Sequence, residues 1–199
     1  QHMYEPSRDS EVVGLLRYVD QQLSAIRASV HGLTEQQARE TPCRSALSIA
    51  GMIKHTAQGM RGVTANLRDG MAADPLTEHD FAQYLAGFVL ADDESTLDVL
   101  AQIDTARADH LAAIAASDPA GENVAPPAPW QGIYDARPIH TRYYLVHQVE
   151  EMARHAGHAD IIREQLDGCS VPALVMTLEG VPANPFFEPY VPAAGTIVA

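Results

Sequence analysis

Apolar residues recur at helical spacing in four long stretches of the chain. In residues 9–30 they recur every three or four positions, as Val19 and Leu23 do, so they share one face of a helix. Asp9 or Ser10 precedes this stretch and is a suitable N-cap, because its side-chain oxygen accepts a hydrogen bond from the first turn. The stretch therefore predicts a first amphipathic helix.

The same periodicity predicts further long helices over about 45–69, 92–117 and 138–166. Gly70 is expected to close the first of these, and Pro138 suits the first position of the last because a helix start needs no N–H there. A shorter helix is expected to begin at Thr34 and to stop near Pro42.

Proline and glycine mark the irregular parts of the chain. They are frequent between Ser117 and Pro138 and again in the tail from Cys169 onward. Four long helices with two long connections predict an all-α fold, a four-helix bundle of about residues 9–168 with an irregular C-terminal extension, 169–199. We expect one domain over 4–199, since Gln1 to Met3 look like a remnant of an expression vector.

The composition of the chain limits the kinds of partner that it can bind. The 199 residues carry a formal net charge of -13, which argues against nucleic acid, because nucleic-acid binding depends on Lys and Arg. A small neutral or cationic ligand fits better. No stretch is apolar enough to predict a membrane span, and two cysteines, Cys43 and Cys169, are too few for a disulfide framework. We expect a soluble, cytoplasmic protein with no membrane partner.

Most of the candidate metal-binding or catalytic side chains lie in the last long helix. They are separated by four, four and three positions: His147, Glu151, His155 and His158. Such steps place all four side chains on one helix face. His55 lies in the second long helix, and a bundle often holds a metal with two ligands four apart on one helix and a third from a facing helix. Spacing alone does not choose among the four candidates.

A polar, solvated helix face explains the same pattern equally well. Glu150 and Arg154 are one helical turn apart and would form an exposed ion pair on that face. On spacing alone, the two interpretations remain open.

Two motifs of the chain resemble those of a known family. "SALSIAGMIKHTAQ" and "RYYLVHQVEEMARHAGHADIIREQLDG" resemble the DinB-like superfamily, and within it the branch of actinobacterial mycothiol S-transferases. The resemblance extends from about Val12 to Gly168. It implies a four-helix bundle with a divalent metal, commonly zinc, held by one ligand from the second helix and two from the last long helix.

Carried over by position, the resemblance implies that His55, Glu151 and His155 hold the metal. Many members have His-x-x-x-His in the last helix, and this chain has Glu-x-x-x-His, as do similar maleylpyruvate isomerases that use mycothiol. The resemblance makes the flanking histidines His147 and His158 candidates for supporting the metal ligands or for contacting the thiol.

Two arginines of this helix, Arg142 and Arg154, occupy positions similar to those of the family. We expect surface salt bridges for both, with binding of a substrate carboxylate as the alternative.

The implied function is that of a zinc-dependent S-transferase, which conjugates mycothiol to a small electrophile through a metal-activated thiolate, as in detoxification. Another divalent metal would suit the same ligands. A metal-dependent hydrolase of thiol conjugates or amides is the runner-up, and a non-catalytic, stress-linked metal-binding bundle is the third interpretation. The resemblance also implies a possible homodimer.

Aromatic residues in the two irregular segments provide a last hypothesis. They could form an apolar wall for the electrophile, or they could simply cover the core; these are Trp130, Tyr134, Phe186, Phe187 and Tyr190.

Overall fold

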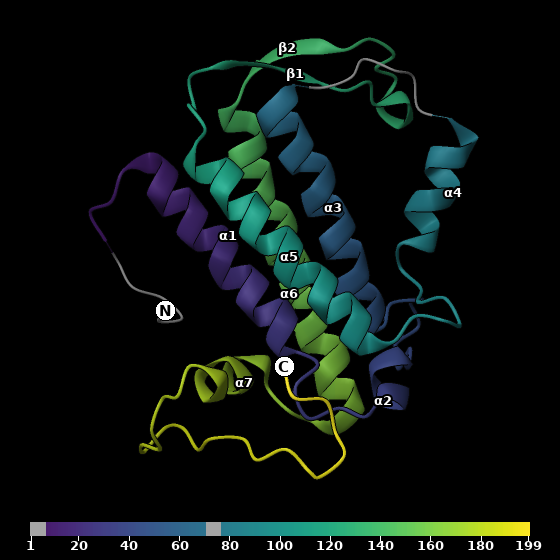
Figure 1. The fold of residues 1–199 in the computed structure, drawn as a ribbon, viewed down its shortest axis with the longest axis vertical. Helices are drawn as coiled ribbons and strands as arrows, with labels where there is room; N and C mark the ends of the chain where they lie inside the picture. Colours follow the sequence, from purple (N-terminus) through teal and green to yellow (C-terminus); the bar gives the residue numbers. More distant parts are fainter. Residues whose placement is uncertain (1–6, 71–76) are drawn as a thin grey trace.

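The computed structural model describes residues 7–70 and 77–199, apart from the side chain of Trp130. The suspected vector remnant and part of the loop after Gly70 lie outside these residues. Four long helices lie side by side along the long axis of the molecule (Figure 1): α1 (Glu11–Ala28), α3 (Ile49–Asp69), α5 (Thr96–Ala115) and α6 (Arg142–Asp167). The predicted all-α bundle is confirmed.

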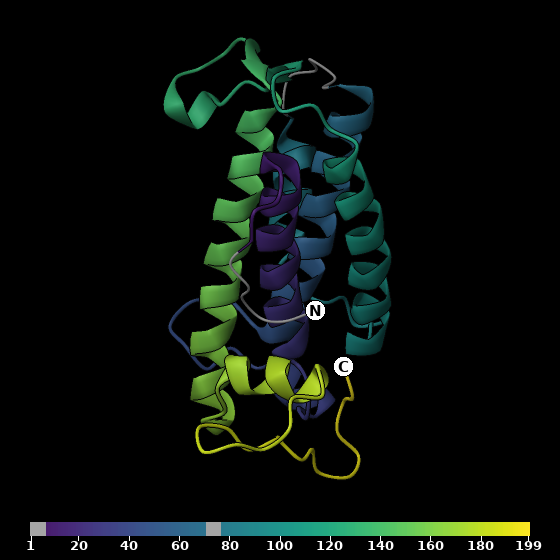
Figure 2. The ribbon, with the colours of Figure 1, turned by 90° about the vertical axis from the view of Figure 1, so that its left-hand side faces the viewer.

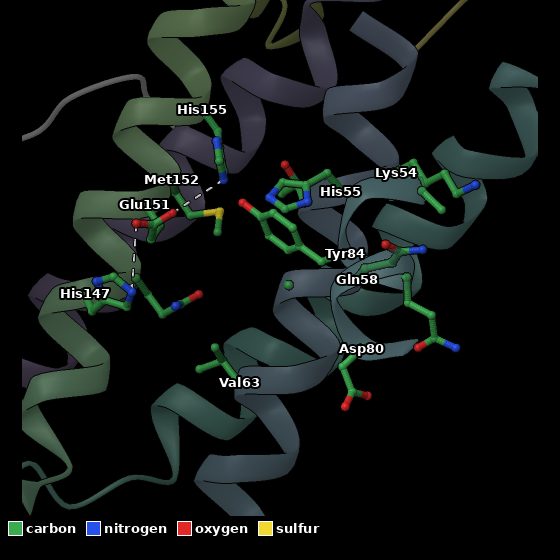
Figure 3. A pocket seen from close by; sticks show the side chains of 15 residues that line it. Lys54, His55, Gln58, Val63, Asp80, Tyr84, His147, Glu151, Met152 and His155 are labelled. Carbon is green, nitrogen blue, oxygen red and sulfur yellow. Dashed lines mark ion pairs between the residues drawn. The ribbon is translucent and has the colours of Figure 1, made fainter. Parts of the chain in front are cut away.

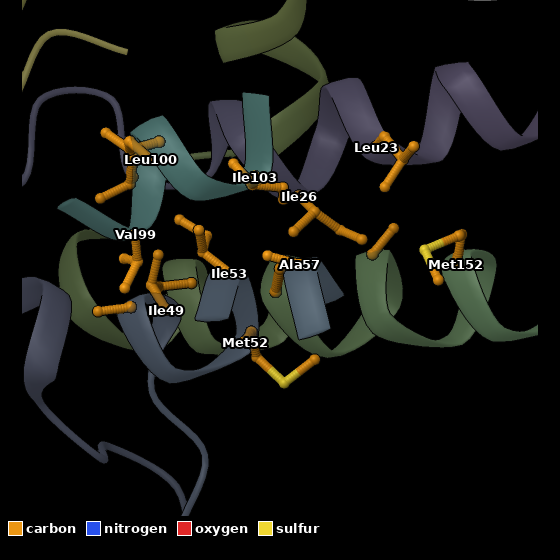
Figure 4. Packing of buried hydrophobic residues seen from close by; sticks show 14 of the residues in the cluster. Leu23, Ile26, Ile49, Met52, Ile53, Ala57, Val99, Leu100, Ile103 and Met152 are labelled. Carbon is orange, nitrogen blue, oxygen red and sulfur yellow. The ribbon is translucent and has the colours of Figure 1, made fainter. Parts of the chain in front are cut away.

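The four helices close on a common apolar core. α3 packs against α5, α5 against α1, α1 against α6, and α6 against α3, an arrangement that Figure 2 shows from the side. Each helix contributes residues that are almost fully buried, such as Leu23, Ile53, Ile103 and Met152 (Figure 4). Burial of a large aliphatic side chain stabilises the folded state by roughly 1.5–3 kcal/mol. The core therefore holds the four helices together and keeps α3 and α6 at a fixed separation.

Side-chain caps set where the helices begin. The Ser10 hydroxyl accepts a hydrogen bond from the amide of Val13 at 3.4 Å, and Ser10, as expected, is the N-cap of α1. The short helix α2 (Glu35–Arg39) begins at Thr34 with a capping box that Gln37 completes, which confirms the prediction there. Such caps satisfy backbone N–H groups that have no partner within the helix.

One helix was not expected from the sequence. α4 (Glu78–Ala86) stands apart from the other helices on the α3 side of the bundle (Figure 1), and none of its residues is buried. Thr77 and Asp80 form its capping box. The helix is nine residues long, and its apolar side chains, such as Phe81 and Leu85, are exposed and do not lie in the core.

The prediction that the last long helix begins at Pro138 was wrong. Pro138 lies in strand β2 (Arg137–His140), which pairs antiparallel with β1 (Glu122–Ala125) opposite Val124. This hairpin, with the 3-10 helix η1 (Pro129–Gln131), covers one end of the bundle (Figure 1). Proline is tolerated in an edge strand as well as at a helix start, because neither position requires a backbone N–H donor.

The expectation of an irregular extension was partly wrong. Ser170 precedes a short helix, α7 (Val171–Leu178), and the segment after it is irregular. Backbone hydrogen bonds from Gly32 N to Ile197 O and from Ile197 N to Leu33 O, both 2.8 Å, fasten the extension to the turn between α1 and α2. It therefore packs on the end of the bundle opposite the hairpin (Figure 1).

A fully buried arginine stabilises this end. Arg163 of α6 donates to the carbonyls of Ser29 and His31, at 2.8 and 2.7 Å, and forms a two-pronged ion pair with Asp167 at 2.9 and 2.7 Å. Its guanidinium lies 5.6 Å from the centre of the Tyr190 ring. The arginine thus links α6, the α1–α2 turn and the extension.

Over residues 7–70 and 77–199, no helix combines the length and the apolar character that crossing a membrane requires.

Candidate active site

The position of His55 follows from the way α3 is capped and buried. The Ser48 hydroxyl accepts a hydrogen bond from the Gly51 amide at 3.1 Å and begins the helix. Ile53 and Thr56 are buried in the bundle, and His55 is half-buried beside them. The imidazole therefore lies at the edge of the core and not in open solvent.

Two aromatic rings hold the His55 ring in place. The Phe88 ring is stacked on it at a centroid distance of 3.9 Å, and the Tyr84 ring meets it edge to face at 5.5 Å. Phe88 can approach because residue 51 of α3 is glycine: a Cβ there would overlap the Phe88 carbonyl. The segment around α4 thus fixes the orientation of His55.

Glu151 and His155 of α6 face His55 across a gap (Figure 3). The rings of His55 and His155 are 5.1 Å apart between centroids and nearly perpendicular, at 86°. The Glu151 carboxylate lies 3.6 Å from His155 Nε2 and 3.9 Å from Nε2 of His147. One carboxylate therefore lies between two histidines.

These residues line one pocket of about 710 Å³ between α3, α4 and α6. Its wall includes His55 and Lys54 of α3, Tyr84 of α4, and His147, Gln148, Glu151, Met152 and His155 of α6. The structure thus brings four of the candidate residues, His55, His147, Glu151 and His155, to one cavity.

The other three candidates do not line this pocket. His158 is exposed, and its ring lies 6.3 Å from that of His155. Arg142 pairs with Glu11 at 2.6 Å, and Arg154 pairs with Glu150 at 3.3 Å. Both ion pairs are on the surface, as we expected for the two arginines.

Burial keeps both facing imidazoles neutral at physiological pH. Burial, with the nearby His155, lowers the pKa of His55 to about 4. Burial also lowers the pKa of His155, against the opposing effect of Glu151 and with smaller contributions from His158 and Arg154. A neutral imidazole has a free lone pair, which is the form that binds a metal.

A second group of ligand atoms lies at the rim of the same pocket. Within the described residues, His147, Glu150 and Glu151 are the three whose ligand atoms all lie within 4.8 Å of one another. His147 Nδ1 is 3.1 Å from a Glu150 oxygen. The ligand atoms of His55, Glu151 and His155 do not all lie that close to one another, and Glu151 belongs to both groups.

A comparison with protein families shows the family of the chain. The family model described as mycothiol-S-transferase matches residues 14–168. The chain belongs to the mycothiol-S-transferase family. This confirms the resemblance drawn from the two motifs and supports a mycothiol transferase type of function with a low-molecular-weight thiol as substrate. Searches of curated proteins and of solved structures each returned no match.

The donor atoms on this pocket wall fit a divalent cation. Two neutral imidazoles and a carboxylate are ligands that zinc and similar metals accept. Nδ1 of His155 is buried and has no hydrogen-bond partner within the described residues, and its Nε2 is 3.6 Å from Glu151, beyond ordinary hydrogen-bond length. His55, Glu151 and His155 could therefore hold a metal on the pocket wall.

The sequence analysis missed several residues of the pocket. The Thr56 hydroxyl and the Gln148 carbonyl oxygen are buried without a partner within the described residues, and both residues line the pocket. Tyr84 was missed because α4 was not predicted. For Gln148, the adjacent His147 was the available signal, but residues next to each other on a helix point in different directions.

Tyr134, Phe186, Phe187 and Tyr190 are not among the described residues that line the pocket. Phe187 is buried, and Tyr190 packs against Gly32 and Arg163 at the end of the bundle. Tyr134 and Phe186 are largely exposed. The covering role thus describes Phe187 and Tyr190, while the side chain of Trp130 lies outside what the structure describes.

Proposed function

We propose that the protein is a divalent-metal-dependent mycothiol S-transferase, with zinc as the metal and His55, Glu151 and His155 as its ligands. The observation that carries this proposal is the convergence of the three side chains from α3 and α6 on one pocket wall, with both imidazoles neutral. Family membership supports the thiol.

A divalent cation at these ligands would supply one effect: it would lower the pKa of an entering thiol, so that the reactive thiolate predominates at neutral pH. The reaction requires the sulfur to form a bond to an electrophilic carbon while the S–H bond breaks and the carbon gives up either a leaving group or the π bond of a double bond. His147, half-exposed at the rim of the pocket, offers an imidazole through which the thiol proton reaches solvent.

The remaining lining suits an uncharged, hydroxyl-rich thiol such as mycothiol. Thr56, Gln58 and Gln148 offer neutral hydrogen-bonding groups to the pocket. Thr56 and Gln148 are almost fully buried, and buried polar atoms without a partner cost free energy that a hydrogen-bonding ligand recovers. Mycothiol carries no phosphate and needs no basic cradle, which is consistent with the acidic composition.

Metal content tests the proposal directly. Elemental mass spectrometry of tag-free protein should find about one zinc per chain, lost in Glu151→Ala, His155→Ala and His55→Ala, and retained in His158→Ala. A protein that stays metal-free after incubation with zinc would refute the metal-dependent function.

The same experiment separates the two ligand groups that share Glu151. Loss of zinc in His147→Ala and Glu150→Ala, with retention in His55→Ala, would move the metal to the rim. Turnover of a thiol conjugate or an amide without added thiol would instead indicate the hydrolase, and tight zinc without turnover would indicate the non-catalytic bundle.

A further inference from the structure

The pocket contains no cation free to bind an anionic substrate, as judged from its described lining residues. Among the described lining residues, Lys54 is the one lysine, and there is no arginine. Its ammonium already has partners, because it lies 2.6 Å from a Glu94 oxygen and donates to the Val89 carbonyl at 3.0 Å. Only 11% of its side chain is exposed. A substrate carboxylate would have to compete with Glu94 for it.

An exposed carboxylate lies at the α4 edge of the same cavity. Asp80 lines the pocket, and its carboxylate accepts hydrogen bonds from the Thr77 amide at 2.7 Å and the Thr77 hydroxyl at 2.6 Å. These bonds hold the pKa of Asp80 below its ordinary value, so the group stays ionised at neutral pH. An anion entering beside α4 would meet repulsion.

The charge at the proposed metal centre does not offset this. A divalent cation, the Glu151 carboxylate and one thiolate sum to zero, so the second substrate would approach a neutral centre. Arg154 and Arg142, the basic residues of α6 considered earlier, are paired with Glu150 and Glu11 on the surface. Neither lines the pocket.

We propose that the electrophile of this transferase carries no negative charge: it is a neutral or cationic compound, and carboxylate-bearing or phosphate-bearing electrophiles are excluded. The inference rests on the proposed thiol transfer and names its substrate class. It also separates this chain from any relative whose substrate is a carboxylic acid, because such a substrate needs a cation that this pocket does not provide.

Two matched maleimides test the charge preference. Mycothiol adds to either N-ethylmaleimide or 3-maleimidopropionate by forming a sulfur–carbon bond, and the thiol proton ends on the neighbouring carbon, so no leaving group is required. With rates divided by the uncatalysed rates, we expect the zinc-loaded protein to favour the neutral maleimide by about tenfold or more. Equal enhancement, or preference for the carboxylate, would overturn the inference while leaving the transferase function intact.

A positive charge placed in the pocket should reduce the preference for the neutral maleimide by a defined amount. Val63 lines the cavity and is half-buried, so Val63→Lys would add a cation there. We expect its relative rate with 3-maleimidopropionate to rise about tenfold. Val191→Lys changes the net charge equally in the extension, at a residue that is 84% exposed, and should leave the ratio unchanged. An equal rise in both variants would contradict a pocket effect.

Binding provides a readout that does not depend on turnover. Ligand-detected NMR should show contact of the unreactive N-ethylsuccinimide with the protein and none for 3-succinimidopropionate. Binding of the anion as strongly as the neutral compound, or no binding of the neutral compound, would overturn the inference. If both maleimides fail to react while only the neutral succinimide binds, the proposed thiol transfer fails and what stands is the selection of the pocket against anions.

Discussion

His55 and His155 meet edge to face across the pocket, with ring centroids 5.1 Å apart and planes at 86°. They come from α3 and α6, whose separation is set by the packed core of the bundle. Two neutral imidazoles in this relation form a preorganised pair, since neither has to give up a proton or a strong ion pair before it binds a cation.

Zinc should therefore stabilise the folded protein. At a free zinc concentration of about one hundred times the dissociation constant, we expect the free energy of unfolding to rise by about 2.7 kcal/mol. Urea denaturation with zinc and with a chelator measures this. His155→Ala should lose the effect and His158→Ala should keep it; an equal gain in both would indicate binding elsewhere.

Gly51 should be intolerant of even a methyl group. A Cβ there would overlap the Phe88 carbonyl, so Gly51→Ala should displace the ring stacked on His55 and destabilise the protein by about 1–3 kcal/mol. Gly62, on the same helix, has open space around it, and Gly62→Ala should stabilise by about 0.5–1 kcal/mol. Thermal unfolding of the two variants should shift in opposite directions.

Acid should weaken the metal-free protein through His110. Its ring is fully buried with the Thr64 hydroxyl 3.0 Å from Nδ1, and burial lowers its pKa to about 4, against a smaller opposing effect of Gln148. Above pH 6.5 the imidazole is neutral in both folded and unfolded chains. As the pH falls towards 4, only the unfolded chain gains the proton, so stability is lost.

The loss attributable to His110 is about 2 kcal/mol between pH 7 and pH 5. Urea denaturation at both values, with chelator present, should show a smaller difference for His110→Leu than for the native chain. His55, whose pKa is also about 4, contributes in the same direction, so part of the dependence should survive. A variant with the full native dependence would contradict the assignment.

Replacing Arg163 should be far more damaging than replacing an exposed arginine. Arg163→Ala would leave Asp167 and two carbonyls without their partner, and we expect a loss of about 3–5 kcal/mol. Arg27 forms an ion pair with Asp104 at 2.6 Å on the surface, and Arg27→Ala should cost less than about 1 kcal/mol. Similar losses in both would mean that the buried network adds nothing.

The thiols of the protein should be dispensable. Neither Cys43 nor Cys169 lines the pocket, and burial raises the pKa of Cys169, which disfavours its nucleophilic thiolate. Conjugation by the Cys43→Ser, Cys169→Ser double variant should stay within about twofold of the native rate. A folded but inactive double variant would instead point to a covalent protein intermediate.

The sequence predicted the parts of the fold that have a strong local signal. The long helices follow from apolar periodicity, and the caps at Ser10 and Thr34 follow from side-chain chemistry. The start of α6 was not predicted correctly, because Pro138 is compatible with both a helix start and the edge strand in which it lies. α4 escaped prediction because it is only nine residues long and follows a loop. The helical order of Val171–Leu178 was obscured by Pro172 in its first turn and by the prolines after it.

The candidate site was predictable along one helix and not across helices. Helical spacing placed His147, Glu151, His155 and His158 on one face of the last long helix without choosing among them. The family resemblance singled out Glu151 and His155, together with His55. The contacts that orient His55 come from Tyr84 and Phe88, and these depend on tertiary packing that no local pattern encodes. The charge-paired state of Lys54 is likewise a property of the fold, because Glu94 is forty positions away.

The chain positions of the facing residues also bear on the order of assembly. Glu151 and His155 are one turn apart, so they come together as soon as α6 is helical. His55 is 96 positions before Glu151, since 151 minus 55 is 96, and it arrives only when a long loop closes and α3 docks. The half of the site on α6 therefore forms by local folding, and the complete site reports that the bundle has closed.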